Sequence, residues 1–476
     1  MKVLLMVAPS EGALTLETSN DISQNMGFFP PLGILYVGTY LRNTSKHEVH
    51  ILDSESERLT YKNIEEKIAL LKPDILGITT FTMTLRNVLD IAKTAKKLNP
   101  KCVVVLGGPH IALYPDETLS FREIDYAVCG DGEYAFKALV ELLDKKLPPG
   151  DHDEALKKIE GIVCRLSDGK IFKNGFARVQ DLDSLPFPDR TYLKKELYFC
   201  ILGKQRTMTT IMSSRGCPFQ CTFCNTPDRM YRFRSAKNVV DELEYIAGLG
   251  IEEAFFFDDL FNISAERAIA VCDEILRRNI KIKWAFRGRV TGITDEFARK
   301  AKQAGCERIQ YGIEKATDES LARVKKASTV KDIVNAVNLT KKYGMMCVGN
   351  FLLFTPGEDE KDADEIIRFA LKLNLDHAEF SVFIPFPGTR IYEDGLKSGF
   401  FKKDYWSEYA KNPDPNFQIA WEEKVPAKRM YEIHSQAHKR FYLRPRIVLN
   451  ELRRISSIGE FIRILKGALI ILRLKD

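Results

Sequence analysis

The sequence lacks the features that mark membrane-spanning, secreted and nucleic-acid-binding proteins. No apolar run reaches the roughly 18 residues that a membrane-spanning helix needs, and the chain opens on the strand-like MKVLLMVAP instead of a signal peptide. Its net charge is only +6, spread along 476 residues, so no basic patch for nucleic acid is indicated. We therefore expect a globular cytoplasmic protein without a nucleic-acid partner.

Cysteine is sparse: the chain has ten, and seven of them are scattered singly. This usage excludes a disulfide framework and favours a reducing compartment. The exception is SSRGCPFQCTFCNTPD, which holds Cys217, Cys221 and Cys224. A structural zinc site needs a fourth ligand, yet Cys200 and Cys272 form no matching pair and no histidine lies within 50 residues. An iron–sulfur cluster fits better, because an iron without a protein ligand stays open to a small molecule.

The first part of the chain, residues 1–147, alternates short β-branched runs with helical patterns. This alternation predicts an α/β fold with a doubly wound parallel sheet, of the Rossmann or flavodoxin-like kind, that binds ligands at the carboxyl ends of its strands. Two of these ends are rich in glycine, LGGPH at 106–110 and CGDGE at 129–133, and glycine lets the backbone approach a large ligand closely. The five predicted strands cover residues 3–9, 48–54, 75–80, 102–108 and 126–130.

A second alternation begins further along the chain. Residues 206–395 contain six strand–helix units with glycine and polar residues at the strand ends, which is typical of a partial (β/α)6 barrel of the TIM type. The chemistry of such a barrel lies at the carboxyl ends of its strands. Residues 148–205 read as a linker that contains a β-hairpin with Ser-Asp-Gly at its turn. The remaining residues, 396–476, predict a helical C-terminal region.

The three-cysteine motif, CxxxCxxC on the loop after the first barrel strand, is the hallmark of radical S-adenosylmethionine (radical SAM) enzymes. The chain resembles the members of that family that carry an N-terminal cobalamin-binding domain, such as the class B methylases, from residue 1 to about residue 445. The blocks that carry the resemblance stand in the family's order: NMGFFPPLGILYVGTYLR, VVVLGGPHIALYPDE, VCGDGEYAF, FFFDDLFN, IQYGIEKATDESLARVKKAST, LLFTPGE and FIPFPGTRIYE.

The resemblance implies how the barrel residues bind the cluster and S-adenosylmethionine. The three cysteines would bind three irons of a 4Fe–4S cluster, and the amino and carboxylate groups of S-adenosylmethionine would chelate the fourth. Phe223 would pack near the adenine, and Asp258 and Asp259 would contact the methionyl amino group, since carboxylates suit an ammonium. A solvated strand end is the alternative for these two carboxylates. Glu314 would reach the ribose or methionyl part, with Gly312 giving backbone room.

Two further features of the barrel sequence bear on the same cofactor. Arg287 or Arg289, on the third strand, would pair with the methionyl carboxylate, with surface solvation as the alternative. Phe354 stands where many radical SAM enzymes carry glycine, so the adenine contacts of that strand are in question. Six scattered cysteines are expected to be buried small hydrophobes: Cys102, Cys129, Cys164, Cys272, Cys306 and Cys347. The wide spacing of Cys102, Cys129 and Cys164 disfavours the second cluster of a methylthiotransferase.

The resemblance also implies a cobalamin site at the carboxyl edge of the first sheet. None of the seven histidines has Asp two positions before it, so the DxHxxG motif is absent and we expect no histidine lower ligand to cobalt. His110 would contact the corrin or its nucleotide tail, or else stabilise the turn. The long loop at residues 9–30 would lie over the corrin. The residues expected to bind cobalamin are Gly107, Gly108, His110, Gly130, Gly132 and Glu133.

The activity that the resemblance implies is a radical methylation. A 5′-deoxyadenosyl radical from S-adenosylmethionine would remove hydrogen from an unactivated carbon, which methylcobalamin would then methylate. An external one-electron donor of the flavodoxin or ferredoxin type would be the redox partner. The alternatives are an oxidoreductase, cyclase or carbon–carbon coupling enzyme whose first domain does not use cobalamin, and, remotely, a non-enzymatic cobalamin sensor. The substrate is a small molecule, and its class stays open.

The C-terminal tail, residues 450–476, mixes basic and apolar residues in a helical pattern. One face of that helix carries the apolar residues Leu452, Ile455, Ile458, Ile462 and Leu465. A basic amphipathic helix can lie on the inner face of an anionic membrane, and such a location would favour a lipid or other hydrophobic substrate. The alternative is a terminal helix docked on the barrel.

Overall fold

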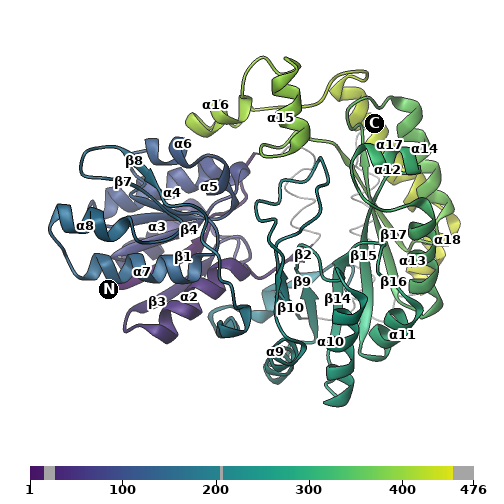
Figure 1. Ribbon diagram of the computed structural model, residues 1–476, viewed down its shortest axis with the longest axis horizontal. Coiled ribbons are helices and arrows are strands. Elements are labelled where there is room, and N and C mark those ends of the chain that lie inside the picture. The colour runs from purple at the N-terminus through teal and green to yellow at the C-terminus, as the bar shows by residue number, and fades with distance from the viewer. Residues whose placement is uncertain (15–26, 204–206, 454–476) are drawn as a thin grey trace. The chain divides into compact units, whose positions relative to one another are not determined.

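The computed structural model describes residues 1–14, 27–203 and 207–453 of the chain. Within these, the chain forms two compact units. The first consists of residues 1–14, 28–198 and 398–418. The second consists of Gly27 and residues 199–203, 207–397 and 419–453. Figure 1 labels their elements. Most of the long loop at residues 9–30 and most of the tail at 450–476 lie outside the described residues.

The first unit is built on a seven-stranded sheet in the order β3-β1-β4-β5-β6-β7-β8. Its first five strands are parallel, as predicted, and the order reverses next to β1, as in the flavodoxin-like fold. The predicted hairpin forms β7 and β8, which extend this sheet in antiparallel fashion. The strands are β1 (Lys2–Val7), β3 (Glu48–Asp53), β4 (Ile75–Thr79), β5 (Val103–Gly107), β6 (Tyr126–Val128), β7 (Ile162–Arg165) and β8 (Ile171–Lys173).

Helices cover both faces of this sheet, because alternate strand residues are apolar on both sides. Val3 and Leu5 of β1 pack with Ile34 and Phe136 in the core beneath α2 and α7, while Leu4 is buried on the other side (Figure 1). Such double coverage is typical of a parallel sheet. The helices of this unit are α2 (Leu32–Thr44), α3 (Tyr61–Leu71), α4 (Leu85–Leu98), α5 (Pro109–Leu113), α6 (Pro115–Ser120), α7 (Gly132–Asp144), α8 (Pro149–Leu156) and α16 (Tyr405–Lys411).

The helix α16 comes from the C-terminal region and packs on the first unit beside α6. The Tyr114 hydroxyl donates to Asp404 over 3.3 Å, and the Ser407 hydroxyl donates to Glu117 over 2.7 Å. Trp406 is fully buried in this segment and lies against the ring of Phe417. A segment distant in sequence thus completes the first unit.

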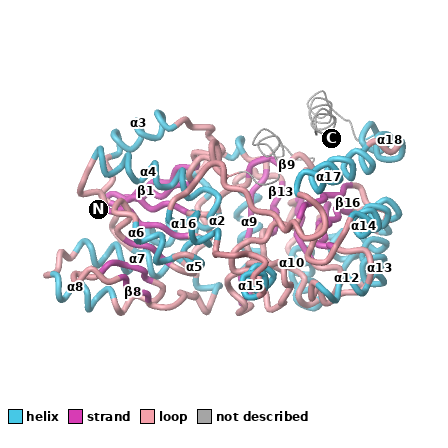
Figure 2. The backbone as a smooth tube through the Cα atoms, turned by 90° about the horizontal axis from the view of Figure 1, so that it is seen from above, coloured by secondary structure: helices cyan, strands magenta, loops and turns pink. Residues whose placement is uncertain are grey.

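The second unit is built on a six-stranded parallel sheet whose strands follow one another in chain order, which is the predicted partial barrel. Its helices lie outside the strands (Figure 2). The strands are β10 (Met208–Ile211), β13 (Glu253–Phe256), β14 (Lys283–Gly288), β15 (Cys306–Glu314), β16 (Met346–Leu353) and β17 (His377–Val382). The helices are α9 (Ala236–Gly248), α10 (Ala265–Arg277), α11 (Asp295–Gln303), α12 (Asp318–Arg323), α13 (Val330–Lys342), α14 (Glu360–Lys372), α15 (Arg390–Lys397), α17 (Ala427–Tyr442) and α18 (Pro445–Arg453).

The barrel helices begin where the sequence offers an N-cap. Ser235, Ser264, Thr294 and Thr329 each accept a hydrogen bond from a backbone N–H of the first turn, which satisfies a donor that the helix leaves unpaired. The short strands are β2 (Gly27–Phe28), β9 (Phe199–Cys200), β11 (Ser214–Arg215) and β12 (Arg232–Phe233), and the single 3₁₀ turns are Thr82–Thr84, Leu182–Ser184, Arg190–Tyr192 and Lys195–Leu197.

The outer edge of the last barrel strand, β17, is covered by α17. The backbone N–H of Phe380 donates to Nε2 of His438 over 3.4 Å, and the Tyr442 hydroxyl donates to the carbonyl of Ala378 over 3.0 Å. These side chains satisfy polar groups that an edge strand otherwise leaves open to pairing. The helical C-terminal region therefore closes the barrel sheet on this side.

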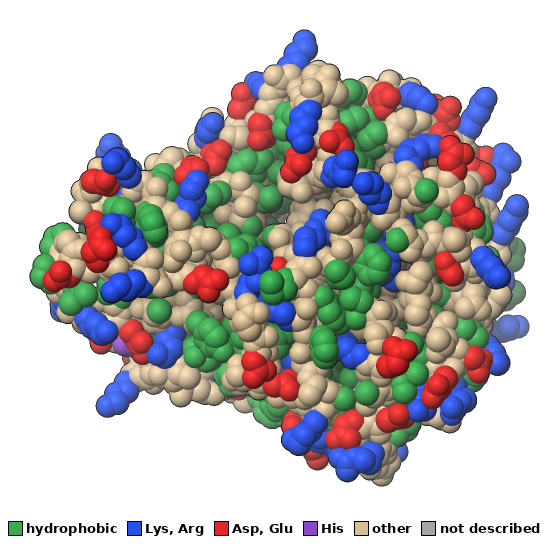
Figure 3. All heavy atoms as spheres, viewed as in Figure 1, with side chains coloured by type: hydrophobic (Ala, Val, Ile, Leu, Met, Phe, Trp, Pro, Cys, Tyr) green, Lys and Arg blue, Asp and Glu red, His purple; other side chains and the backbone are tan. Residues whose placement is uncertain are grey.

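None of the helices in the described part of the chain combines the length and apolar character that crossing a bilayer requires. On the face shown in Figure 3, Lys and Arg side chains alternate with Asp and Glu. Such mixing leaves no broad field of one sign on this face.

Candidate functional site

The cysteine loop follows β10 at the carboxyl end of the barrel strands and is closed at its base by the short strands β11 and β12, which pair antiparallel. Asp228 and Arg232 form a buried ion pair of 2.6 Å there. The carbonyl of Asp228 accepts from the backbone N–H of Cys217 over 3.1 Å. Gly216 has a φ of +81°, and a Cβ at this position would lie 2.3 Å from the carbonyl oxygen of Met230. Only glycine fits this start of the loop.

The three predicted cluster cysteines lie together on this loop. Cys221 is buried, and Cys217 and Cys224 are partly buried. Burial is the largest cause of the raised pKa of Cys217, and the neighbouring Cys224, Asp259 and Cys221 raise it further. In the described residues no three side chains converge on a single metal ion, and the thiolates of an iron–sulfur cluster bind separate irons. Thiolates are the ligands that iron–sulfur clusters use, and the donor set fits one.

Two carboxylates hold the base of the cysteine loop. Asp258, which is buried, accepts from the backbone N–H of Ser213 over 2.6 Å and from the Ser214 hydroxyl over 2.7 Å. Asp259 accepts from the backbone N–H of Gly216 over 3.0 Å. Burial raises the pKa of both carboxyls. Asp258 is therefore no solvated strand end, and its contact with the methionyl amino group stays a prediction.

Arg289 is the basic residue that the structure brings to the cysteines. Its Nη1 lies 3.8 Å from Sγ of Cys221, and its guanidinium stacks on the ring of Phe219 at 3.9 Å. The backbone is fixed by Asn262, whose Oδ1 accepts from the N–H of Arg289 and whose Nδ2 donates to its carbonyl. The sequence proposed this arginine for the methionyl carboxylate or for solvent, and its place beside a cysteine sulfur was not foreseen.

Glu314 ends β15 at a shift in register and in a strained conformation. Its φ is +68°, in the left-handed region that side chains seldom adopt. It forms a largely buried ion pair of 2.9 Å with Lys326, whose Nζ also lies 5.8 Å from the ring of Phe223. A Cβ on Gly312 would lie 2.7 Å from Nζ of Lys326, so the glycine makes room for the ion pair. Lys326 was missed from the sequence, although it lies within a quoted family block.

The ends of β15 and β16 are joined by a buried ion pair. Nζ of Lys315 lies 2.6 Å from Glu358 and donates to the carbonyl of Leu352 over 2.7 Å. Phe354, between these partners, is buried and has a φ of +63°. This value explains why glycine suits the position, because the left-handed region costs a residue with a Cβ about 1–2 kcal/mol.

At the carboxyl edge of the first sheet the predicted glycines have different surroundings. A Cβ on Gly108 would lie 2.7 Å from the carbonyl oxygen of Thr80, and one on Gly130 would lie 2.3 Å from that of Ala177. A Cβ on Gly132 would lie 2.8 Å from a methyl group of Val37. At Gly107 no atom of the described residues lies within 4 Å of such a Cβ. Gly107 therefore leaves open space at the strand end, where a large ligand can approach.

His110 is fully buried behind the end of β5. Its Nδ1 lies 3.0 Å from the Thr82 hydroxyl, and its Nε2 has no partner among the described residues. Burial lowers the pKa of His110 to about 4, so the ring is neutral at pH 7. An unpaired buried ring nitrogen is costly, and a bound ligand with amide groups would satisfy it. Gly107 and His110 thus fit a cobalamin site. Glu133 is buried in the first turn of α7.

The chain was compared with known proteins. A B12-binding domain model matches residues 26–140, and the radical SAM superfamily model matches residues 211–370. The uncharacterized methyltransferase PH0819 of Pyrococcus horikoshii is 32% identical over 461 residues, which cover 95% of each chain. The chain belongs to the radical SAM superfamily. It is a radical SAM enzyme with a B12-binding domain ahead of its catalytic barrel.

Two further relatives extend the comparison. The anaerobic magnesium-protoporphyrin IX monomethyl ester cyclase of Rubrivivax gelatinosus is 29% identical over 376 residues, 77% of this chain and 66% of its own. The structure of OxsB, a cobalamin-dependent radical SAM enzyme with aqua-cobalamin and S-adenosylmethionine bound, has a TM-score of 0.72 and 17% identity. It covers 98% of this chain and 70% of its own. The predicted fold and two-domain order of this radical SAM protein are thus confirmed.

Six other cysteines of this radical SAM protein, which the sequence assigns to the core, take no part in the loop. Burial raises the pKa of each of these six thiols and keeps them protonated, as befits small core residues. All but Cys129, which is half-buried, are inaccessible: Cys102, Cys164, Cys272, Cys306 and Cys347.

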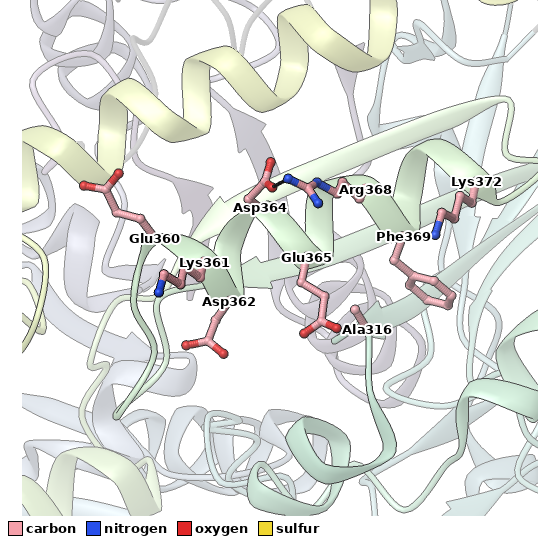
Figure 4. Close-up of a pocket in the computed structure, with 9 residues that line it drawn as sticks. All are labelled: Ala316, Glu360, Lys361, Asp362, Asp364, Glu365, Arg368, Phe369 and Lys372. Atoms are coloured by element: carbon pink, nitrogen blue, oxygen red, sulfur yellow. Dashed lines mark ion pairs between the residues drawn. The ribbon is translucent and has the colours of Figure 1, made fainter.

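A surface pocket runs along α14 on the outside of the barrel (Figure 4). Its charged side chains pair locally: Asp364 with Arg368 at 2.6 Å, and Glu360 with Arg429 of α17 at 2.9 Å. It contains none of the predicted site residues. The pocket is a solvated helix face.

Proposed function

We propose that the protein is a cobalamin-dependent radical SAM methyltransferase that methylates an unactivated carbon of a small molecule. The observation that carries the proposal is the presence, in one chain, of the closed three-cysteine loop and of a B12-type sheet with open space at Gly107. The methyltransferase from Pyrococcus horikoshii that matches nearly end to end supports methyl transfer over other radical chemistry.

The cluster and the cobalamin supply the difficult chemistry when bound: one-electron cleavage of S-adenosylmethionine and carriage of a methyl group. The residues of the chain hold and orient these groups. Cys217, Cys221 and Cys224 bind the irons, Phe223 packs on the adenine, and Glu314 fixes the ribose or methionyl part. Asp258 and Asp259 fix the base of the loop through their hydrogen bonds and face the methionyl ammonium.

On the first unit, the glycines at the strand ends and His110 hold the corrin or its tail. The neutral His110 offers one ring nitrogen to an amide of the cofactor, while Thr82 fixes the other nitrogen. We assign it no bond to cobalt. Gly107 and Gly108 bring the backbone close, and Gly130, Gly132 and Glu133 flank the same edge.

A second candidate function is ring formation without methyl transfer, since the Rubrivivax gelatinosus relative is a cyclase. Trideuteriomethyl S-adenosylmethionine separates the two. The enzyme is incubated with a reductant and a small-molecule extract, and the products are analysed by mass spectrometry. A product that carries the label supports methyl transfer. Products formed with 5′-deoxyadenosine but without label support the cyclase.

The cofactor assignment has its own test. The chain is purified anaerobically, reconstituted with iron, sulfide and hydroxocobalamin, and its metals are counted. We expect about four irons and one cobalt per chain. The Cys217, Cys221 and Cys224 triple alanine variant loses the iron, whereas C102A keeps it. Gly107→Leu loses the cobalt, whereas Gly33→Leu, on the exposed side of α2, keeps it. Retention of cobalt by Gly107→Leu contradicts the placement of the corrin.

We also propose a peripheral contact with anionic membrane lipid through residues 450–476. Residues 454–476 lie outside the described part of the chain. The support comes from α18, where Leu449 and Leu452 are each 50% exposed beside Arg446 and Arg453. Sedimentation with phosphatidylglycerol vesicles tests it: wild type sediments, and the L449E/L452E variant stays in solution. If wild type also stays in solution, the contact is contradicted and a tail docked on the barrel is favoured; if both proteins sediment equally, α18 does not carry the contact.

A further inference from the structure

The barrel strands have an apolar outer face and a polar inner face. Alternate residues such as Phe286, Ile309 and Phe380 belong to the core under the helices, because successive strand residues point to opposite sides. The other set faces the inside of the barrel. On adjacent strands it includes Arg287 of β14, Gln310 of β15, Asn350 of β16 and Glu379 of β17, and the strand register sets Arg287 opposite Gln310 and Asn350 opposite Glu379.

Three of these inner residues form a hydrogen-bonded chain. Nε2 of Gln310 donates to Asn350 Oδ1 over 3.1 Å and approaches a carboxylate oxygen of Glu379 at 3.4 Å. This long contact is the one polar partner of the Glu379 side chain among the described residues, and it leaves most of the carboxylate's accepting capacity unused. Glu379 therefore has the capacity to accept further donors.

Arg287 faces the same interior without neutralising this carboxylate. Its guanidinium lies 4.8 Å from the ring of Phe257 and 5.7 Å from that of Phe255. In the described part of the chain neither Arg287 nor Glu379 forms an ion pair. Both side chains are exposed to solvent, and the surrounding protein still lowers the pKa of Arg287 and raises that of Glu379 by desolvation. Polar side chains on the inner face of the barrel sheet are therefore accessible to a ligand.

Glu379 adjoins the region assigned to S-adenosylmethionine. The charge of Glu314 raises the pKa of Glu379, and that of Arg287 lowers it, so both groups lie within electrostatic reach of Glu379. Glu314 is already neutralised by Lys326. Glu379 is thus an accessible carboxylate without an ion-pair partner, with a perturbed pKa, beside the proposed reaction centre, and such groups are candidates for a binding function.

We infer that Glu379 binds a hydrogen-bond donor of the organic substrate, an ammonium or a hydroxyl group, inside the barrel. Gln310 and Asn350 orient the carboxylate, and Phe255 and Phe257 form an apolar wall on the other side. The substrate is then a molecule with a polar donor group and an apolar or aromatic part, rather than a plain hydrocarbon. This inference rests on the proposed radical SAM function.

The test measures 5′-deoxyadenosine formed by the reconstituted holoenzyme with a chemical reductant. Cell metabolites are extracted into an aqueous and a lipid fraction, and the half-saturating amount of each active fraction is determined. Wild type is compared with E379Q, E379A and E365A. Glu365 is an exposed carboxylate on the outside of α14 (Figure 4) and serves as the matched control.

We expect E379A to need at least about tenfold more of the active fraction than wild type or E365A, since a hydrogen bond to a charged group contributes that much. E379Q distinguishes the two donor groups. If E379Q needs as much of the active fraction as E379A, the donor is an ammonium; if it needs less, the donor is a hydroxyl. The active fraction tells whether a water-soluble metabolite or a lipid carries the group.

The iron content and the thermal unfolding temperature of each variant are measured to show whether it is folded. Because Glu379 has no ion-pair partner, we expect E379Q to unfold at the wild-type temperature or above, whereas a structural carboxylate would lower it. An active fraction that saturates E379A and wild type alike overturns the inference and leaves the proposed function standing. If wild type forms no 5′-deoxyadenosine with any fraction, the proposed function itself fails.

Discussion

Nη1 of Arg289 lies 3.8 Å from Sγ of Cys221, with the guanidinium stacked on Phe219 and the backbone fixed by Asn262. The potential of an iron–sulfur cluster depends on nearby charge and on hydrogen bonds to its sulfurs. A cation at this sulfur stabilises the reduced, more negative form. With a cluster on Cys221, as proposed, Arg289 would position this ligand and ease reduction of the cluster.

Replacement of Arg289 tests this relationship. We expect R289Q to lower the midpoint potential of the reconstituted cluster by on the order of 60 mV, the equivalent of a tenfold change for a one-electron couple, and R289K to lower it less. The potential is measured by redox titration with electron paramagnetic resonance. Arg229 donates to the carbonyl of Cys224 and to no sulfur, so R229Q is the control for the loop scaffold. Equal potentials in R289Q and wild type contradict the role.

The buried pair of Lys315 and Glu358 predicts a large loss of stability when one partner is removed. K315M leaves the carboxylate of Glu358 buried without its ammonium, at a cost of about 3–5 kcal/mol. The double variant K315M/E358L removes both charges and should recover most of that loss. The exposed pair of Lys342 and Asp295 is the control, and K342M should change stability far less than K315M, because solvent screens an exposed ion pair.

These free energies are measured by urea unfolding followed through tryptophan fluorescence. Trp284 is buried in the barrel core and reports on the unit that contains the pair. If K315M and K342M lose the same small amount, the buried pair contributes no more than a surface pair, and the prediction is wrong.

The positive φ of Phe354 predicts an unusual order of substitutions. Both F354A and F354G lose a buried ring, but glycine also relieves the left-handed strain. We therefore expect F354G to be the more stable by about 1 kcal/mol. Phe351 is equally buried but is not among the positive-φ residues. There we expect F351A to be more stable than F351G, because glycine weakens a strand. Urea unfolding of the four variants checks both orders.

Much of the fold was predictable from the sequence because its periodicity is local. The parallel strands of both sheets appear as short β-branched runs, and the Ser-Asp-Gly turn predicts the hairpin at 162–173. The return of residues 398–418 to the first unit was not predictable. Its contacts, such as that of Ser407 with Glu117, join residues far apart in sequence, and no local pattern encodes them.

The site was predictable only in part, for the same reason. The cysteine spacing is a local signal, whereas the contact of Arg289 with Cys221 and the pairing of Lys326 with Glu314 depend on the barrel closing. Glu379 did leave a trace in the sequence: it is the acid within the strand HAEFSV. An acid at the centre of an apolar strand points to the inner face of a barrel.

The packing of α17 on β17 predicts a pH dependence of stability. Burial, together with the charge of the neighbouring His438, lowers the pKa of His434 to about 4. The unfolded value is about 6.5, so the unfolded chain binds more protons between these two values and the free energy of unfolding falls as the pH falls. The stabilisation is complete above about pH 6.5 and is lost towards pH 4. Its size is at most about 3 kcal/mol.

Urea unfolding of wild type and H434F at a series of pH values measures this effect. H434F keeps a ring between Tyr431 and His438 but cannot take up a proton, so its stability should fall less between pH 6.5 and pH 4. H50Q, at a histidine on the surface of the first unit, should retain the wild-type slope. If H434F and wild type lose stability in parallel, His434 is not the group that titrates, and the acid sensitivity arises elsewhere, for instance at the buried His110 of the first unit.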